Sequence, residues 1–309
     1  MKYFITGGSG FIGRNLVLSL LKKNSKVTVL DINKFPFKIK NKNFKFIKGS
    51  ILNKKLLLQS MKNSDTVIHL AANSKISEGF KNPMLDIRAG IYGTVNVLES
   101  LRELNINDLI YTSGSGVYGN QTRGKLKEDF SPLNPVSTYG STKLASENLM
   151  SSYSYFYNLN VSILRPCNIV GKYMTHGVIY DLIKKLKKNK THINVLGNGQ
   201  QIKPYIDVID LISAIKILLK KRLKGFNYYN IANEDLVSVK YIAEQIIKNS
   251  KYKNAKLFYA KSRSGWKGDV YKYSLNNAKL RRLGWEPKFN AKKTIDNAIL
   301  INLKENEII

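Results

Sequence analysis

The chain has 309 residues, with 51 Lys and Arg against 21 Asp and Glu, so its formal net charge is +30, and 43% of its residues are hydrophobic. This composition excludes a disordered, collagen-like or coiled-coil chain, and the length suits one large domain or two modest ones. The charge points either to an anionic partner (nucleic acid, a membrane surface or a phosphorylated substrate) or to a general bias toward Lys, Asn and Ile.

Strand-like apolar runs alternate with segments of helical periodicity over the first half of the chain. Strands are predicted at residues 3–6, 26–30, 44–47, 66–70, 109–113 and 161–165, and helices at 11–22, 54–62, 83–104 and 139–157. This alternation predicts an α/β fold, a doubly wound parallel sheet with helices on both faces. Beyond residue 171 the pattern loosens into short strands at 193–196, 227–231 and 256–259 and helices at 178–188, 208–220, 239–248 and 291–303. We therefore predict a first domain of residues 1–171 and a smaller α/β substrate-binding region of residues 172–309, with some of its elements returning to the first domain.

The first predicted strand runs into a glycine-rich loop, T-G-G-S-G-F-I-G at residues 6–13, that opens a helix. Gly7, Gly10 and Gly13 let the backbone turn tightly and approach a pyrophosphate, which the helix N-terminus then faces with free N–H groups. Asp31 ends the second strand, 31 − 13 = 18 positions after the last of these glycines. A carboxylate there accepts hydrogen bonds from both ribose hydroxyls and repels a 2′-phosphate. Strand, glycines, helix, strand and acid in this order predict a Rossmann-type domain that binds NAD rather than NADP.

A tyrosine and a lysine lie four positions apart in the helix predicted at 139–157, as Tyr139 and Lys143. Four positions put both side chains on one helix face. A tyrosine with an ordinary pKa of about 10 is a poor base at neutral pH, and lowering its pKa to about 7 needs roughly 4 kcal/mol of preference for the phenolate. A nearby ammonium and an oxidised nicotinamide both supply such preference, so the pair predicts a tyrosine base assisted by a lysine.

With these residues in place, the chain resembles the extended short-chain dehydrogenase/reductases of the NAD-dependent epimerase/dehydratase family, in particular a branch described as UDP-glucose 4-epimerase-like. Shared motifs stand at residues 69–72 (H-L-A-A), 93–99 (G-T-V-N-V-L-E), 117–119 (V-Y-G), 165–171 (R-P-C-N-I-V-G), 175–180, 197–201 and 265–269. The resemblance implies a nucleotide-sugar enzyme of carbohydrate metabolism and polysaccharide biosynthesis, with NAD as cofactor and a UDP-linked sugar as substrate. It also implies a homodimer formed through the helices at 83–104 and 139–157.

The resemblance also assigns residues to the two ligands. Cofactor contacts are expected from Gly7, Gly10, Phe11, Ile12, Gly13, Asp31, Ser50, Ile51, Leu70, Ala71, Ala72, Tyr139 and Lys143. Substrate contacts are expected from Asn168, and from Lys203 in place of a family arginine on the diphosphate, with Arg263 and Lys267 as further cations. His69, at the end of a buried strand, is expected to be structural or to lie beside the cofactor.

The chain departs from the family at the catalytic hydroxyl. Relatives carry Ser or Thr three residues before the V-Y-G, where this chain has Gly114 between Ser113 and Ser115. Because a hydroxyl is needed to hold the reacting sugar oxygen beside the tyrosine, we expect one of these serines to take the role and favour Ser115. Two further departures are Ser50, where the family has Asp near the adenine, and Gly90, where many relatives have Asn.

The reaction implied is C4 epimerisation. Tyr139 removes the proton of the C4 hydroxyl, hydride passes to NAD, the 4-keto sugar turns over and the hydride returns to its other face. Related 4,6-dehydratases carry an Asp-Glu pair directly after the catalytic hydroxyl, whereas this chain has Ser115 and Gly116, which disfavours water elimination. A reductase, a decarboxylase or a 2-epimerase of the same fold remains open, and neither the sugar nor the nucleotide base is named by any motif.

A different class of function is a basic nucleic-acid-binding or regulatory protein on the same fold. Its usual sign is one basic block with interleaved aromatic residues, but the lysines here form short scattered clusters, so we predict no nucleic-acid partner. The single cysteine, Cys167, excludes an intrachain disulfide and fits the cytoplasm. We expect no secretory signal, no membrane span and no metal site, because the apolar runs are far below about 20 residues and the histidines lack ligand spacing.

Overall fold

The computed structural model describes residues 1–74, 76–121, 124–263, 265 and 268–309. The chain divides into two compact units. The first unit comprises residues 1–117, 134–165 and 212–229, and the second comprises 118–133, 166–211 and 230–309. The two units interleave along the chain, and the two-domain division at residue 171 stays a prediction.

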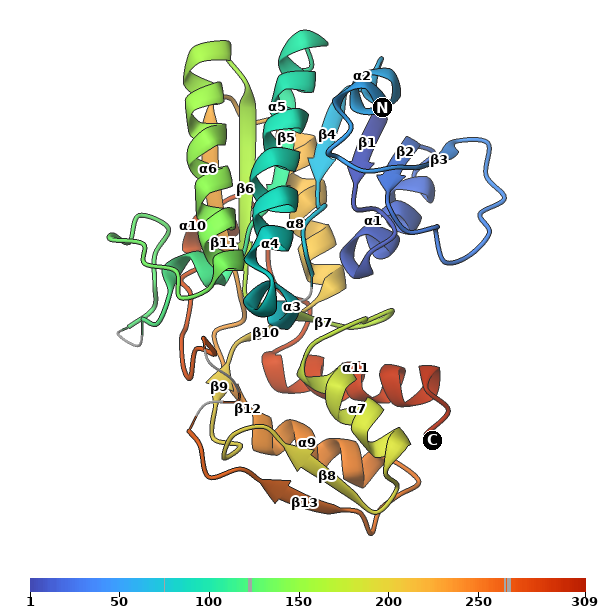
Figure 1. Cartoon of the computed structure of the whole chain (residues 1–309), viewed down its shortest axis with the longest axis vertical. Helices are drawn as coiled ribbons and strands as arrows, with labels where there is room; N and C mark the ends of the chain where they lie inside the picture. Colours follow the sequence, from blue (N-terminus) through green and yellow to red (C-terminus); the bar gives the residue numbers. More distant parts are fainter. Residues whose placement is uncertain (75, 122–123, 264, 266–267) are drawn as a thin grey trace. The chain divides into compact units, whose positions relative to one another are not determined.

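The first unit is built on a seven-stranded sheet (Figure 1). Its strands are β1 (Lys2–Thr6), β2 (Lys26–Asp31), β3 (Phe44–Lys48), β4 (Thr66–His69), β5 (Asp108–Thr112), β6 (Asn160–Pro166) and β11 (Phe226–Ile231), in the order β11-β6-β5-β4-β1-β2-β3. The pairs from β6 across to β3 are all parallel. Strand order reverses between β1 and β4, and in such sheets the crevice outside the carboxyl ends at this point receives ligands. The predicted fold is confirmed.

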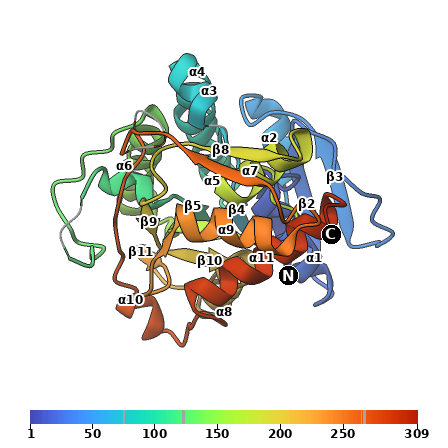
Figure 2. The same cartoon turned by 90° about the horizontal axis from the view of Figure 1, so that it is seen from below.

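Helices cover both faces of this sheet. One face carries α2 (Lys54–Met61), α5 (Gly93–Glu103) and α6 (Thr138–Tyr157), and the other carries α1 (Phe11–Leu21) and α8 (Val208–Lys221), as Figures 1 and 2 show together. Under the first face lies an apolar core of strand and helix residues that includes Phe4, Val67, Leu98, Leu109 and Val161. Apolar side chains at every second strand position produce this arrangement, because successive residues of a strand point to opposite faces.

The segment predicted as one helix at 83–104 contains three parts. It begins as α4 (Pro83–Ile87), continues through a π-helical turn, η1 (Arg88–Tyr92), and ends as α5. Gly90 in this turn lies against α6 so closely that a Cβ there would be 2.7 Å from Cβ of Thr142. A wider turn at a glycine therefore lets this segment and α6 pack at close range. Two short helices flank it without having been predicted, α3 (Ile76–Lys81) before it and the 3₁₀ turn η2 (Ser115–Tyr118) after β5.

Within its described residues, the second unit contains three two-stranded sheets. Parallel pairs join β7 (Asn168–Val170) to β10 (Tyr205–Asp207) and β8 (His192–Val195) to β13 (Lys256–Tyr259), and an antiparallel pair joins β9 (Ile202–Lys203) to β12 (Val237–Ser238). Its helices are α7 (Val178–Lys188), α9 (Val239–Asn249), α10 (Ala278–Arg281) and α11 (Ala291–Glu305). Helices α9 and α11 lie side by side in both views (Figures 1 and 2). Across the described residues, none of the helices is both long and apolar enough to span a bilayer.

Candidate active site

The glycine loop lies at the carboxyl end of β1, and backbone atoms pack there where side chains would otherwise stand. Gly7 has φ +71° and donates its N–H to the Leu30 carbonyl at 2.9 Å. A Cβ on Gly7 would lie 2.7 Å from the Ala71 nitrogen, and one on Gly13 would lie 2.5 Å from the Gly7 carbonyl oxygen. Phe11 begins α1 directly after the loop, with Ile12 beside it. The loop is therefore a bare backbone cradle at a helix N-terminus, which fits the pyrophosphate of NAD.

Asp31 ends β2 beside this cradle and is tied to it by a hydrogen bond. Its carboxylate accepts the Ser9 N–H at 2.9 Å and the Asn33 N–H at 2.8 Å. Burial raises the pKa of Asp31, and the two backbone N–H groups oppose that rise. Each carboxylate oxygen retains a second acceptor site, so the arrangement fits hydrogen bonds from ribose hydroxyls.

The other expected cofactor residues follow the neighbouring parallel strands. Leu70 and Ala71 leave β4 with their N–H groups hydrogen bonded to the carbonyl and the hydroxyl of Thr6, at 3.1 and 3.2 Å, and Ala72 follows. After β3, Ser50 accepts the Leu52 N–H on its Oγ at 3.2 Å, and Ile51 is buried. Because parallel neighbouring strands end at the same edge of a sheet, the structure brings these segments together around the cradle.

Tyr139 and Lys143 lie in the first two turns of α6, whose start is fixed by a cap. Ser137 accepts the Gly140 N–H on its Oγ at 3.1 Å. Lys143 is 4% exposed, and its Nζ lies 5.6 Å from the centre of the Tyr139 ring. Burial lowers the pKa of Lys143 to about 8, against an opposing effect of the Glu147 charge. The two side chains are neighbours, as the spacing predicts.

The surroundings of Tyr139 do not by themselves make it a base. Burial, followed by the negative charge of Asp86, raises its pKa to about 12. Asp86 is a buried residue of α4 that accepts a hydrogen bond from Asn73 Nδ2 at 2.8 Å. A base at neutral pH therefore needs an added positive charge near the phenol, and an oxidised nicotinamide provides one.

The two candidate serines differ in accessibility. Ser113 is 3% exposed, and within the described part of the chain its Oγ has no hydrogen-bond partner. Ser115 begins η2 and is partly exposed. Between them, a Cβ on Gly114 would meet no heavy atom within 4 Å. A substrate hydroxyl reaches a partly exposed side chain more readily than a buried one, which favours Ser115.

Three of the expected substrate residues lie in the second unit and have protein partners there. Asn168 Nδ2 donates to the Pro204 carbonyl and to the Tyr273 hydroxyl, both at 3.2 Å. Lys203 forms an ion pair with Asp269, and the Arg263 guanidinium lies 4.3 Å from the centre of the Tyr271 ring. Lys267 lies outside the described residues. A diphosphate would have to compete with Asp269 for Lys203, and the substrate role of these four residues stays a prediction.

Three neighbours of the tyrosine–lysine pair were not predicted from any sequence motif. Tyr111 and Thr112 end β5 and contact Lys143: its Nζ lies 4.6 Å from the Tyr111 ring centre and 2.7 Å from the Thr112 carbonyl oxygen. Asp86 acts on Tyr139 from α4. Two of them have a weak signal in the sequence. Asp86 is an acid within an apolar helical stretch, and Tyr111 is an aromatic residue at a strand end.

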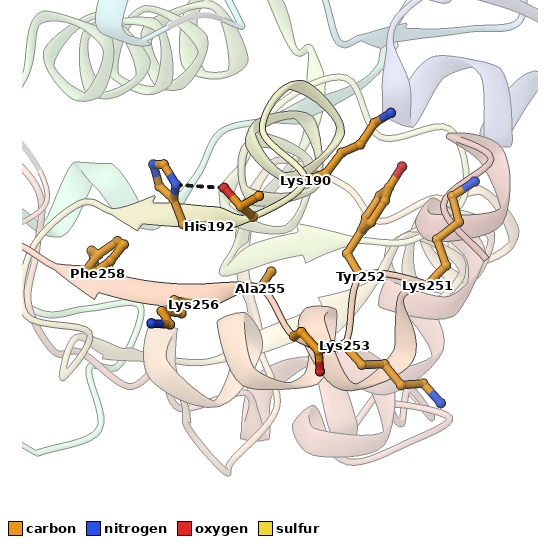
Figure 3. Close-up of a pocket in the computed structure, with 10 residues that line it drawn as sticks. Lys190, His192, Lys251, Tyr252, Lys253, Ala255, Lys256 and Phe258 are labelled. Atoms are coloured by element: carbon orange, nitrogen blue, oxygen red, sulfur yellow. Dashed lines mark hydrogen bonds between the residues drawn. The ribbon is translucent and has the colours of Figure 1, made fainter.

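A surface concavity of about 540 Å³ lies in the second unit, apart in sequence from these residues (Figure 3). Lys190, Lys251, Lys253 and Lys256 line it, with Tyr252, His192 and Phe258 among them. Lysines that are scattered in sequence thus share one open basic hollow, which contains none of the expected site residues. Among the described residues no group of three His, Cys, Asp or Glu is placed to hold a metal ion.

Comparisons with known proteins agree with this geometry. Residues 3–232 match the model of the NAD dependent epimerase/dehydratase family. The chain is 35% identical over 268 residues to a dTDP-D-glucose 4,6-dehydratase of Dictyostelium discoideum, a match that spans 80% of this chain and 61% of that protein. It is 31% identical to a putative UDP-glucose 4-epimerase of Methanocaldococcus jannaschii, over 96% of both chains. A solved structure, MoeE5 in complex with UDP-glucose and NAD, has 25% identity and a TM-score of 0.88 over 99% of this chain and 100% of that one.

Proposed function

Because the chain belongs to the NAD-dependent epimerase/dehydratase family, we propose that it is a nucleotide-sugar epimerase that inverts C4 of a UDP-linked sugar. The observation that carries this proposal is the Tyr139–Lys143 pair on one face of α6, together with Ser115 and Gly116 where dehydratases have two acids. Epimerases and dehydratases share this family and the cofactor NAD. The absence of the two acids is therefore what favours epimerisation over dehydration.

In the proposed reaction each protein group has one task. The glycine loop and Asp31 would hold NAD, which would supply the hydride acceptor and donor of the reaction. Tyr139 takes the proton of the C4 hydroxyl as that carbon is oxidised and gives it back after the sugar has turned over. Lys143, as a cation, favours the phenolate over the phenol. Ser115 accepts or donates a hydrogen bond at the same sugar oxygen and holds it within reach of the tyrosine.

Water elimination is the second candidate, because the similar protein from Dictyostelium discoideum is named as a dehydratase. Elimination across C5 and C6 of a 4-keto sugar needs one group to remove the C5 proton and another to protonate the leaving 6-hydroxyl. At residues 115 and 116 this chain has a hydroxyl and no side chain. Asp86 is the carboxylate that acts on Tyr139, but it is buried and bonded to Asn73. We therefore rank elimination second.

The substrate proposal extends to the nucleotide and the assembly. MoeE5 was solved with UDP-glucose, which supports a UDP-linked sugar for this chain. A homodimer through the helices of residues 83–104 and 139–157 is proposed because their outer faces carry large exposed apolar side chains, including Tyr92 at 57% and Tyr155 at 83%. The product would serve carbohydrate or polysaccharide synthesis.

The test is incubation of purified, NAD-loaded protein with UDP-, GDP- and CDP-sugars, with products followed by NMR and no reductant added. We expect one UDP-sugar to reach an equilibrium with its C4 epimer. Tyr139→Phe should lower turnover by at least about a thousandfold while circular dichroism and NAD retention stay unchanged, since the base alone is removed. Near-normal epimerisation by that variant would refute the assignment of the base.

A further inference from the structure

The Lys143 ammonium lies closer to the end of β5 than to the Tyr139 ring. Its ammonium donates a hydrogen bond to the Thr112 carbonyl at 2.7 Å and lies over the face of the Tyr111 ring, 4.6 Å from the ring centre. The distance to the Tyr139 ring centre is 5.6 Å. A cation within about 6 Å of an aromatic face is attracted by the negative charge of that face, and the attraction grows when water is excluded. Lys143 is 4% exposed, so this condition is met.

The Tyr111 ring is itself held on two sides. It is 1% exposed and lies 5.4 Å from the ring of His69, its register partner on β4. Its hydroxyl hydrogen bonds to Ser146 of α6, whose Oγ in turn lies 2.8 Å from the carbonyl oxygens of Gly90 and Thr142. Burial raises the pKa of Tyr111, so the ring stays a neutral phenol. The ring is thus a fixed platform between β4 and α6.

We propose that Tyr111 of β5 is a positioning residue that holds the Lys143 ammonium on its ring face. The ring keeps this ammonium charged and directed toward Tyr139, the proposed base on the same helix as Lys143. The consequence for turnover rests on the proposed function, whereas the effect on Lys143 itself does not. Burial opposes the charged form of a lysine, and a ring face supports that form without introducing a counter-charge that would also act on Tyr139.

Other titratable groups also lie around Lys143. On β4, His69 is buried between the hydroxyls of Thr6 and Thr94, and burial, with a further effect of the Lys143 charge, lowers its pKa to about 3, so it is neutral. On α6, Glu147 favours the charged lysine, but its carboxylate is held by Arg165 of β6 at 2.6 Å. Tyr139 lies beside Lys143, and Asp86 of α4 acts in turn on Tyr139.

The experiment titrates Lys143 directly, in NAD-loaded protein labelled with ¹³C at the lysine Cε atoms, with the resonance assigned through Lys143→Arg. Position 111 is varied as Tyr111→Phe, then with phenylalanines bearing one and three ring fluorines, and finally as Tyr111→Leu. Fluorine withdraws electron density from the ring face and leaves the volume of the side chain almost unchanged. Ile110→Ala, a buried residue on the opposite face of β5, is the matched control.

We expect the pKa of Lys143 to fall stepwise with fluorination and by about one pH unit in Tyr111→Leu, while Tyr111→Phe and Ile110→Ala leave it unchanged. In active protein, loss of turnover on the alkaline side should move to lower pH in the same order, because Lys143 then loses its proton earlier. A pKa that is constant across the fluorinated series would overturn the proposal. If no sugar is turned over at all, the titration still tests the role of Tyr111. Failure of the proposed epimerase function can therefore be told apart from failure of the Tyr111 proposal.

Discussion

At the scale of single residues, the position that most needs explaining is Gly114, where the family has its catalytic hydroxyl. The structure shows Ser113 enclosed and Ser115 partly exposed, with open space at the Cβ position between them. A hydroxyl displaced by one residue along η2 is the simplest way for this chain to retain its chemistry.

That explanation predicts the effects of three substitutions on kcat. Ser115→Ala should lower kcat by about a hundredfold, because one hydrogen bond to the reacting oxygen is lost, while Ser113→Ala should change it by less than about threefold. Adding Gly114→Ser to Ser115→Ala should restore part of the loss, since a Cβ at position 114 would meet no heavy atom within 4 Å. Steady-state kinetics on the accepted sugar measure all three. A large loss in Ser113→Ala with Ser115→Ala unaffected would reverse the assignment.

Residue spacing predicts a pair within one helix better than contacts between elements. Tyr139 and Lys143 follow from a four-residue interval, and the structure places them as neighbours. Tyr111 and Asp86 reach the same pair from β5 and α4, and their approach depends on strand register and on the π-helical turn. Neither register nor a wider helical turn has a periodic signature in the sequence.

At the scale of elements, α6 is fixed to the sheet by a buried ion pair. Arg165 of β6 donates three hydrogen bonds to Glu147, one turn beyond Lys143, and its guanidinium lies 4.8 Å from the centre of the Tyr228 ring. The side chains are 5% and 2% exposed. This contact joins β6 to the helix that carries Tyr139 and Lys143.

Glu147→Gln should lower the free energy of unfolding by about 3–5 kcal/mol, because it leaves Arg165 buried without its counter-charge. Urea unfolding followed by circular dichroism measures the change. The control is Glu244→Gln, which breaks an exposed pair with Lys240 at 3.9 Å and should cost less than about 0.5 kcal/mol. Equal effects of the two substitutions would show that the buried pair does not anchor α6.

Sequence patterns predict the long elements and miss the short ones for a physical reason. The six strands expected in the first half appear within a residue or so of their predicted ends, since at least three residues of each run are apolar. Strands β9 and β12 have two residues each, too few for any alternation. They are defined by their pairing with each other and, for Ile202 of β9, by a bridge to Lys272.

At the scale of the whole molecule, the charge of +30 is only partly explained by the expected ligands. Lys143 is proposed to assist the tyrosine base, and Lys203 forms an ion pair with Asp269. The lysines of the second-unit hollow, among them Lys190 and Lys253, look scattered in sequence but share one surface in space. Charge runs in a sequence therefore underestimate local positive potential, although most of the cations remain on solvated faces.

We predict that the protein forms a homodimer in solution. Light scattering should give a mass of 2 × 35.1 = 70.2 kDa, and the double substitution Tyr92→Glu with Tyr155→Glu should reduce it to 35.1 kDa by placing charges on an apolar contact. Phe258→Glu, at a 52% exposed residue of β13, should leave the dimer intact. A monomer at micromolar concentration in the unsubstituted protein would contradict the dimer.

Epimerisation and elimination are distinguished by running the reaction on the accepted UDP-sugar in D₂O, with no added nicotinamide, and following it by NMR. Epimerisation moves the C4 hydrogen as hydride within the site, so we expect the C4 epimer with no deuterium at any carbon. Elimination removes and replaces the C5 proton, so a 4-keto-6-deoxy product carrying deuterium at C5 would contradict the epimerase proposal and show that the enzyme is a dehydratase.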